Sequence, residues 1–265
     1  MLKDITLGQF FPGDTLVHRL DPRSKLLLVV LYIVALFQAA GWASYGLALL
    51  AAIGCMALSH IRPRSLFKGL KPLLFIVVFT ALLNVFYTTG TPILPGWIIT
   101  WEGIARAVKM VLRIVLLVTS TFLLTYTTSP MVLTDGLERL MNPLKKIRVP
   151  VHEITLMMSM ALRFIPTLIE ETDKIMSAQQ SRGADFENGN LVQRAKALLP
   201  ILVPLFVSAF RRADELAIAM ESRCYHGGQG RTRMKQLVFE GRDYAALLVG
   251  AVFLAAVIVL KKIGL

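Results

Sequence analysis

The feature that most constrains this 265-residue chain is a set of long apolar stretches. Residues 26–58 carry only apolar, small or weakly polar side chains. This stretch is too long for one crossing, because ~20 helical residues span a bilayer. Gly41 and Trp42 lie near its middle, where a glycine permits a turn and a tryptophan suits the membrane–water interface. The pattern therefore predicts a tight hairpin of two membrane helices.

Three further stretches are predicted to cross the membrane, at residues 72–87, 104–126 and 244–260. The chain is 55% hydrophobic and only 17% charged, which is too apolar for a typical soluble domain of this size. The predicted fold class is an all-α integral membrane protein with about five transmembrane helices. Residues 1–20 lack the apolar core of a cleavable signal peptide, and we expect none there.

The charges predict the orientation. Residues 62–71 form a basic loop, whereas residues 88–103 contain no lysine or arginine, and 16 of the 29 basic residues lie in residues 128–242. Basic loops stay on the cytoplasmic side, so we expect the N-terminus and residues 128–242 in the cytoplasm. The net charge of +12 follows from this bias, and we expect the lipid bilayer and no nucleic acid as a partner. Lys261 and Lys262 would then lie outside, against the rule.

These assignments divide the chain into three parts. Residues 1–127 are predicted to be an N-terminal segment with four transmembrane helices. Residues 128–242 are predicted to be a cytoplasmic domain, and residues 243–265 a C-terminal transmembrane helix.

Three helices are predicted in the cytoplasmic part. The first follows Pro130 and ends near Asn142, the second covers residues 151–181, and the third covers residues 191–222. The third contains an apolar run flanked by charges that leaves ~14 uncharged residues, which is short for a crossing. A topology in which this helix is inserted in the membrane is the main structural alternative.

Two small–arginine–small triplets end the second and third of these helices. Arginine suits docking to another protein, because its planar fork makes several directed hydrogen bonds. A single triplet would be adequately explained as a favourable charge at a helix C-terminus, but two matched ones favour a docking role. The predicted docking residues are Ser181, Arg182, Gly183, Ser222, Arg223 and Cys224.

Two other clusters lie in the second cytoplasmic helix. Met157, Met158 and Met160 fall in one turn, and they either fill a core or form an adaptable surface for a partner. The acidic cluster of Glu170, Glu171 and Asp173 is expected to be a solvated face.

No common catalytic motif is found. His152-Glu153 lacks the second histidine of a zinc protease, and residues 227–232 lack the Gly-Lys-Ser/Thr ending of a phosphate-binding loop. We therefore expect no cofactor, no metal and no catalytic residue. The alternatives are a membrane-embedded lipid-modifying enzyme, which needs clustered carboxylates or histidines at the interface, and a stand-alone carrier.

One charged helix face lies inside the fourth predicted span. Arg106, Lys109 and Arg113 are spaced by three and four residues and so share a face. We expect this face to lie against protein or to reach an interface, and a polar substrate path is the alternative.

Several of these residues carry a family resemblance. The chain resembles the transmembrane T component of energy-coupling factor transporters over essentially its whole length. The signs are the motif of residues 19–26 (RLDPRSKL), the motif of residues 161–166 (ALRFIP), and the two arginine triplets, the second within residues 221–225 (ESRCY).

The resemblance implies a subunit of the prokaryotic cell membrane that joins two cytoplasmic ABC-type ATPases to one small membrane substrate-binding (S) subunit for uptake of vitamins or metal ions. It implies that residues 128–242 are a coupling domain and that both triplets contact the ATPases, with Arg182 and Arg223 as the coupling arginines. It also implies that ATP hydrolysis resides on the partners. It also places the helix with Met157 between the ATPases and the S subunit. The usual triplet is Ala-Arg-Gly. Here serine replaces alanine in both triplets, and Cys224 replaces the second glycine.

Overall fold

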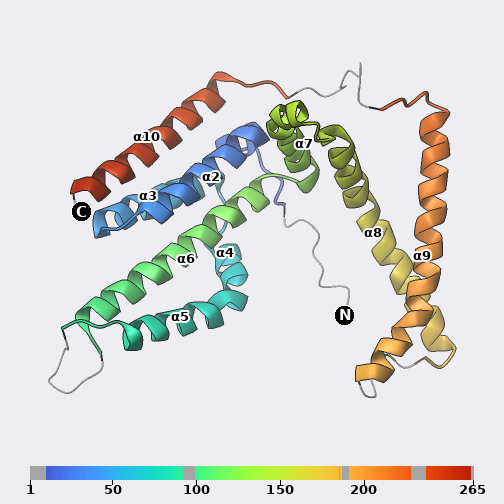
Figure 1. The fold of residues 1–265 in the computed structure, drawn as a ribbon, viewed down its shortest axis with the longest axis horizontal. Helices are drawn as coiled ribbons and strands as arrows, with labels where there is room; N and C mark the ends of the chain where they lie inside the picture. Colours follow the sequence, from blue (N-terminus) through green and yellow to red (C-terminus); the bar gives the residue numbers. More distant parts are fainter. Residues whose placement is uncertain (1–9, 92–98, 185, 187–190, 228–236, 264–265) are drawn as a thin grey trace. The chain divides into compact units, whose positions relative to one another are not determined.

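The computed structural model describes residues 10–91, 99–184, 186, 191–227 and 237–263. Every regular element in these residues is a helix, as the sequence predicted (Figure 1). The described residues form two compact units. Unit 1 lies within residues 141–236, and unit 2 comprises residues 8–140 and 237–265. Each unit is treated below by itself.

Unit 2 begins with the predicted hairpin. After the short helix α1 (Leu16–Arg19), α2 (Pro22–Gln38) and α3 (Trp42–Ser59) are separated by three residues that include Gly41. Pro22 stands in the first turn of α2, where its fixed φ suits a helix start. The hairpin prediction is confirmed.

The next helices follow a short loop, residues 60–62. α4 (Pro63–Leu70), the 3₁₀ turn η2 (Lys71–Leu73) and α5 (Leu74–Tyr87) form an almost continuous helical segment, which begins nine residues before the predicted start at residue 72. Pro63 supplies that earlier start, and Pro72 is accommodated in the 3₁₀ turn. α6 (Trp101–Thr127) and α10 (Gly241–Ile263) extend the predicted fourth and fifth spans by a few residues at their ends.

Four helical segments in the described residues are long and apolar enough to cross a membrane: residues 42–59, 63–87, 101–127 and 241–263. α2 has 17 residues, which is at the lower limit for a transmembrane helix. α9 (Leu191–Glu221) is long enough at 31 residues but is not among the four, so its composition gives no support to the alternative topology with this helix inserted.

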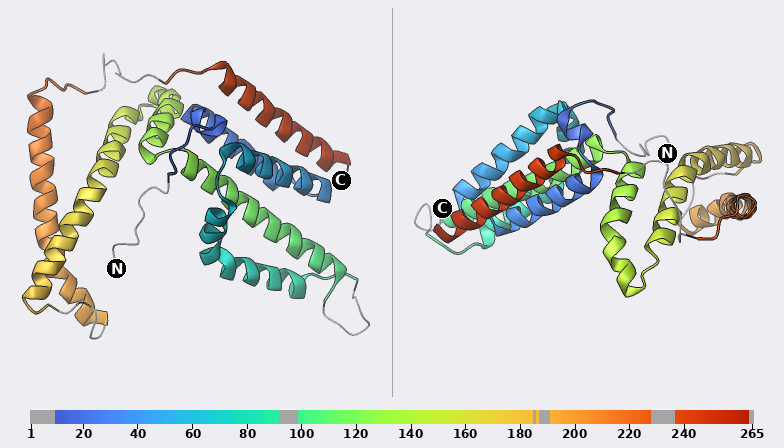
Figure 2. Two further views of the ribbon diagram at one scale, coloured as in Figure 1. Left: turned by 180° about the vertical axis from the view of Figure 1, so that it is seen from behind. Right: turned by 90° about the horizontal axis from the view of Figure 1, so that it is seen from above.

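The core of unit 2 lies where α2, α3, α6 and α10 pack together, as Figure 1 and both views of Figure 2 show. Leu36 is completely buried and packs with Ala48 and Leu116. Gly250 in α10 lets this helix approach α2 closely, because a Cβ at this position would lie 2.5 Å from Cδ2 of Leu28. Small residues at such contacts are typical of helix packing inside membranes.

α7 (Pro130–Met141) packs on the start of α2. A Cβ at Gly136 would lie 3.0 Å from Cβ of Pro22, so this position requires a glycine-sized residue. The predicted helix after Pro130 is therefore present, and most of it belongs to unit 2.

Unit 1 consists of the 3₁₀ helix η3 (Asn142–Ile147), α8 (Val151–Ser181) and α9. α8 and α9 are each 31 residues long and contact each other. Both predicted long helices are confirmed, with boundaries within a residue of those predicted.

Candidate functional site

The first arginine triplet forms the C-terminal cap of α8. The amide of Gly183 donates to the carbonyl of Gln180 at 2.9 Å, and the amide of Ala184 donates to that of Gln179 at 3.0 Å. Gly183 has φ +90°, in the left-handed region that glycine adopts without steric cost. These features define a Schellman cap, in which two otherwise unpaired helix carbonyls are satisfied.

The second triplet forms the same cap on α9. The amide of Cys224 donates to Glu221 at 2.9 Å, and the amide of Tyr225 donates to Met220 at 3.0 Å. Cys224 has φ +55°, so it occupies the position that Gly183 has in the first cap. The replacement of glycine by cysteine thus leaves the cap pattern intact, although a residue with a Cβ costs ~1–2 kcal/mol in this conformation.

All six triplet residues are exposed, as a docking role requires. Neither the guanidinium of Arg182 nor that of Arg223 has a hydrogen bond or ion pair with another described residue. The hydroxyl of Ser181 donates to the carbonyl of Ser177 at 3.0 Å, and that of Ser222 donates to Ala219 at 3.0 Å. The serine hydroxyls are therefore engaged with their own helices, while the guanidinium groups are free to bind a partner.

The two tips lie at opposite ends of unit 1. α8 and α9 cross and run in opposite directions in Figure 1 and in the left view of Figure 2. At the far end of α9, the hydroxyl of Tyr225 lies 3.5 Å from Nε2 of His152, near the start of α8. Two equivalent, separated tips can each receive one copy of a similar partner.

A polar contact joins α8 to α9. Glu171 accepts hydrogen bonds from the hydroxyl of Ser208 and from Nη2 of Arg212, the latter at 2.9 Å. The bond from Ser208, together with the charge and hydrogen bond of Arg212, lowers the pKa of Glu171 against the opposing effect of burial. The expectation of a solvated acidic face is wrong for Glu171, because the crossing of the two helices brings α9 against it.

The three methionines lie on α8. Met157 and Met158 are exposed, and Met160 is half-buried. Further apolar side chains of unit 1 are exposed on α9, among them Phe206 and Phe210. Met157 and Met158 therefore do not fill a core in this chain by itself.

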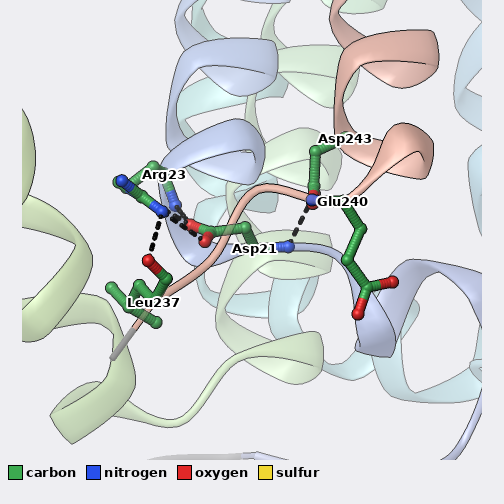
Figure 3. Close-up of polar contacts among 5 residues, drawn as sticks. All are labelled: Asp21, Arg23, Leu237, Glu240 and Asp243. Carbon is green, nitrogen blue, oxygen red and sulfur yellow. Dashed lines mark hydrogen bonds and ion pairs between the residues drawn. The ribbon is translucent and has the colours of Figure 1, made fainter. Parts of the chain in front are cut away.

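The motif of residues 19–26 joins three helices at one end of unit 2. The carboxylate of Asp21 caps α2 by accepting from the amide of Arg23 at 2.9 Å, and it also accepts from Nη2 of Arg23 at 2.8 Å. The amide of Asp21 donates to Oδ1 of Asp243 at 2.8 Å, and Arg23 also donates to the carbonyl of Leu237 at 3.0 Å (Figure 3). Oδ2 of Asp243 caps α10 through the amide of Glu240 at 2.9 Å.

Lys25 extends this network to α6. Its buried ammonium donates to the carbonyls of His18 and Thr127 at 3.1 Å and to the hydroxyl of Thr128 at 3.0 Å. The family motif thus fixes the starts of α2 and α10 and the end of α6. Sequence reasoning missed Asp243, because its partner Asp21 is 222 positions away along the chain.

The part of the chain that the structure describes contains no cluster of three or more His, Cys, Asp or Glu side chains suited to a metal ion. Cys55 and Cys224 are both free thiols.

Comparisons with known proteins agree with this arrangement. Residues 13–234 match the family model CbiQ, described as cobalt transport protein. The chain is 51% identical to the energy-coupling factor transporter transmembrane protein EcfT of Ruminiclostridium cellulolyticum over 99% of both chains. It is 52% identical to EcfT of Clostridium kluyveri over 99% of this chain and 98% of the relative. It is 49% identical to EcfT of Bacillus subtilis over 97% of this chain and 98% of the relative.

These matches cover the membrane helices, both arginine triplets and the motif that begins α2. The chain therefore belongs to the CbiQ/EcfT family and is a transmembrane component of an energy-coupling factor transporter.

Proposed function

We propose that this chain couples two cytoplasmic ABC-type ATPases to one substrate-binding membrane subunit, and that Arg182 and Arg223 each anchor one ATPase. The observation that carries the proposal is the pair of identical helix caps, each of which presents a guanidinium without a partner among the described residues. An unpaired arginine with small neighbours can enter a groove and bind carboxylates or carbonyls there. Hydrolysis of ATP then takes place on the partners.

The orientation supports the same scheme. Unit 1 together with α7 contains most of the basic residues of the chain and lies on the cytoplasmic side of the cell membrane, with the N-terminus. Residues 128–242 act as the coupling domain between the two membrane parts of the chain, residues 1–127 and 243–265. The ATPases reach the tips from the cytoplasm.

Coupling proceeds by movement of packed helices. When ATP binding draws the ATPases together, the force on each tip is applied to α8 or α9. The contact of Glu171 with Ser208 and Arg212 resists sliding of α8 along α9. A change in the crossing angle of the two helices therefore requires less energy than sliding. This movement is transmitted to the substrate-binding subunit.

The substrate-binding subunit contacts the exposed methionines of α8. Met157, Met158 and Met160 supply a flexible apolar surface that can adapt to non-identical partners. Exchange of all three for leucine keeps volume and apolarity, so the fold is expected to be retained. The affinity for at least one substrate-binding subunit should fall more than for the others. Equal binding of all of them by the triple variant would show that these methionines only fill space in the complex.

Replacement of both arginines by alanine tests the anchoring role. Loss of a charged anchor from a buried contact costs ~2–5 kcal/mol, so the double variant should lose ATPase binding and ATP-driven uptake while it still inserts in the membrane. Arg211→Ala is a matched control, because it removes an exposed positive charge from the middle of α9. Wild-type uptake by the double variant would overturn the proposal.

A further inference from the structure

A pocket of about 320 Å³ lies in unit 2, at the end opposite the Asp21 network. Residues of α2, α6 and α10 line it, together with Tyr45 of α3. Four cations surround it: Arg106, Lys109, Arg113 and Lys261. We call it the basic pocket. None of its lining residues is acidic.

Within the described residues, the cations of the basic pocket form hydrogen bonds only with neutral groups. Lys109 donates to the carbonyl of Ala40 at 2.9 Å, and Arg113 donates to that of Ala39 at 3.2 Å. These bonds satisfy the carbonyls at the C-terminal end of α2, which is a structural role with a favourable charge. They leave both positive charges without a counter-ion in the part of the chain that the structure describes.

The other two cations are not explained by this capping role. Lys261 donates to the side-chain amide oxygen of Gln38 at 2.7 Å. Arg106 is exposed and has no hydrogen bond or ion pair with any described residue. The guanidinium of Arg113 also has a buried Nε–H that finds no acceptor among the described residues. Four like charges that converge on one pocket repel one another, and an anion among them relieves this cost.

The aromatic rings beside the basic pocket are of the kind found at membrane–water interfaces. The ammonium of Lys109 lies 5.2 Å from the ring centre of Trp42, and the guanidinium of Arg113 lies 5.9 Å from that of Phe37. Both rings are exposed on the surface of the helix bundle. Tryptophan at this position is typical of the headgroup level, with the ring towards lipid and cations within reach of phosphate.

We infer that the basic pocket binds the phosphate group of an anionic phospholipid in the leaflet that surrounds this end of unit 2. Cations between helices suit a lipid headgroup, and the exposed rings of Phe37 and Trp42 lie where its acyl chains would begin. In the orientation proposed above, this is the outer leaflet. A bound lipid then explains why cations such as Lys261 lie on the side where the positive-inside rule disfavours them.

The full-length protein in mild detergent tests this inference. Native mass spectrometry would follow the binding of phosphatidylglycerol, with phosphatidylcholine of the same chain length as the neutral-headgroup reference. Each positive charge near an anionic headgroup contributes about a five-fold change in affinity. Arg106→Gln, which breaks no contact with a described residue, should weaken phosphatidylglycerol binding about five-fold. The triple variant Arg106→Gln/Lys109→Gln/Lys261→Gln should weaken it about a hundredfold.

Lys262→Gln is the matched control. Lys262 is the neighbour of Lys261 and is exposed, but it does not line the basic pocket, so this change should alter affinity less than two-fold. Equal affinity of the wild type for the two lipids would overturn the inference, and so would wild-type affinity in Arg106→Gln and the triple variant. Complete displacement of phosphatidylglycerol by inorganic phosphate would show that a soluble anion is the occupant instead.

Discussion

Removal of the Asp21 carboxylate should loosen the end of unit 2 where α2, α6 and α10 meet. The side chain of Asp21 is 3% exposed and that of its partner Arg23 is 13% exposed, so water cannot replace their contacts. The carboxylate accepts three hydrogen bonds from Arg23, from the backbone amide, Nε and Nη2 at 2.9, 3.0 and 2.8 Å. Asp21→Ala removes all three and leaves a buried guanidinium that retains only the carbonyl of Leu237 among its described hydrogen-bond acceptors.

Breaking one partner of a buried ion pair costs ~3–5 kcal/mol. The carbonyl of Leu237 and the ring of Phe239, whose centre is 4.0 Å from the guanidinium, still contact Arg23 in the variant. We therefore expect a cost at the lower end of this range, about 3 kcal/mol. Loss of the helix cap accounts for about 1 kcal/mol of this. Asp21→Asn keeps an oxygen acceptor for the cap, so it should cost correspondingly less.

The control is a shorter ion pair at the surface. Arg242 and Glu240 are 2.6 Å apart but 49% and 57% exposed, and such pairs contribute ~1 kcal/mol or less. The free energy of unfolding of both variants can be measured in mixed micelles by titration with a denaturing detergent. If Asp21→Ala costs no more than Glu240→Ala, burial does not determine the strength of the Asp21 network and the reasoning fails.

Two further predictions concern unit 1. Gly183→Ala should destabilise the α8 cap and Cys224→Gly should stabilise the α9 cap, each by about 1 kcal/mol, because both residues have left-handed backbone conformations. Amide hydrogen exchange at the two helix ends measures both effects. A change in stability of the same sign for both variants would contradict the prediction. The pKa of Glu171 is lowered from its ordinary value near 4.5, so the ionised carboxylate stabilises the α8–α9 contact at pH values above 4.5. This contribution is lost as the pH falls through the lowered pKa. Spin labels on the two helices should therefore separate on acidification in the wild type, whereas Glu171→Gln should show no such transition.

The sequence predicted most of the helices because membrane helices depend on local apolarity and on proline and glycine at their ends. The hairpin turn before Trp42 and the helix that follows Pro150 are examples. The start at Pro63 was missed because the basic residues that follow it resemble a loop in composition. Their helix is stabilised by packing on α6, where Phe122 covers Gly69.

The tips of α8 and α9 could be predicted because a small residue after the last helical turn is a local signal. The contacts between helices could not be predicted, because they depend on residues far apart in the sequence. Glu171 looked like part of a solvated acidic face, and only the crossing of α9 over α8 pairs it with Arg212. The role of Asp243 could not be predicted for the same reason, since its partner Asp21 lies at the other end of the sequence.

The central claim is that each helix tip holds one ATPase. A photo-crosslinking residue at Ser181 or at Ser222 tests it most directly, because both side chains are exposed next to the proposed anchors Arg182 and Arg223. In the assembled transporter, each position should crosslink to an ATPase, and each signal should disappear when the adjacent arginine is replaced by alanine. Crosslinks from both tips to the substrate-binding subunit or to lipid, with none to an ATPase, would contradict the account.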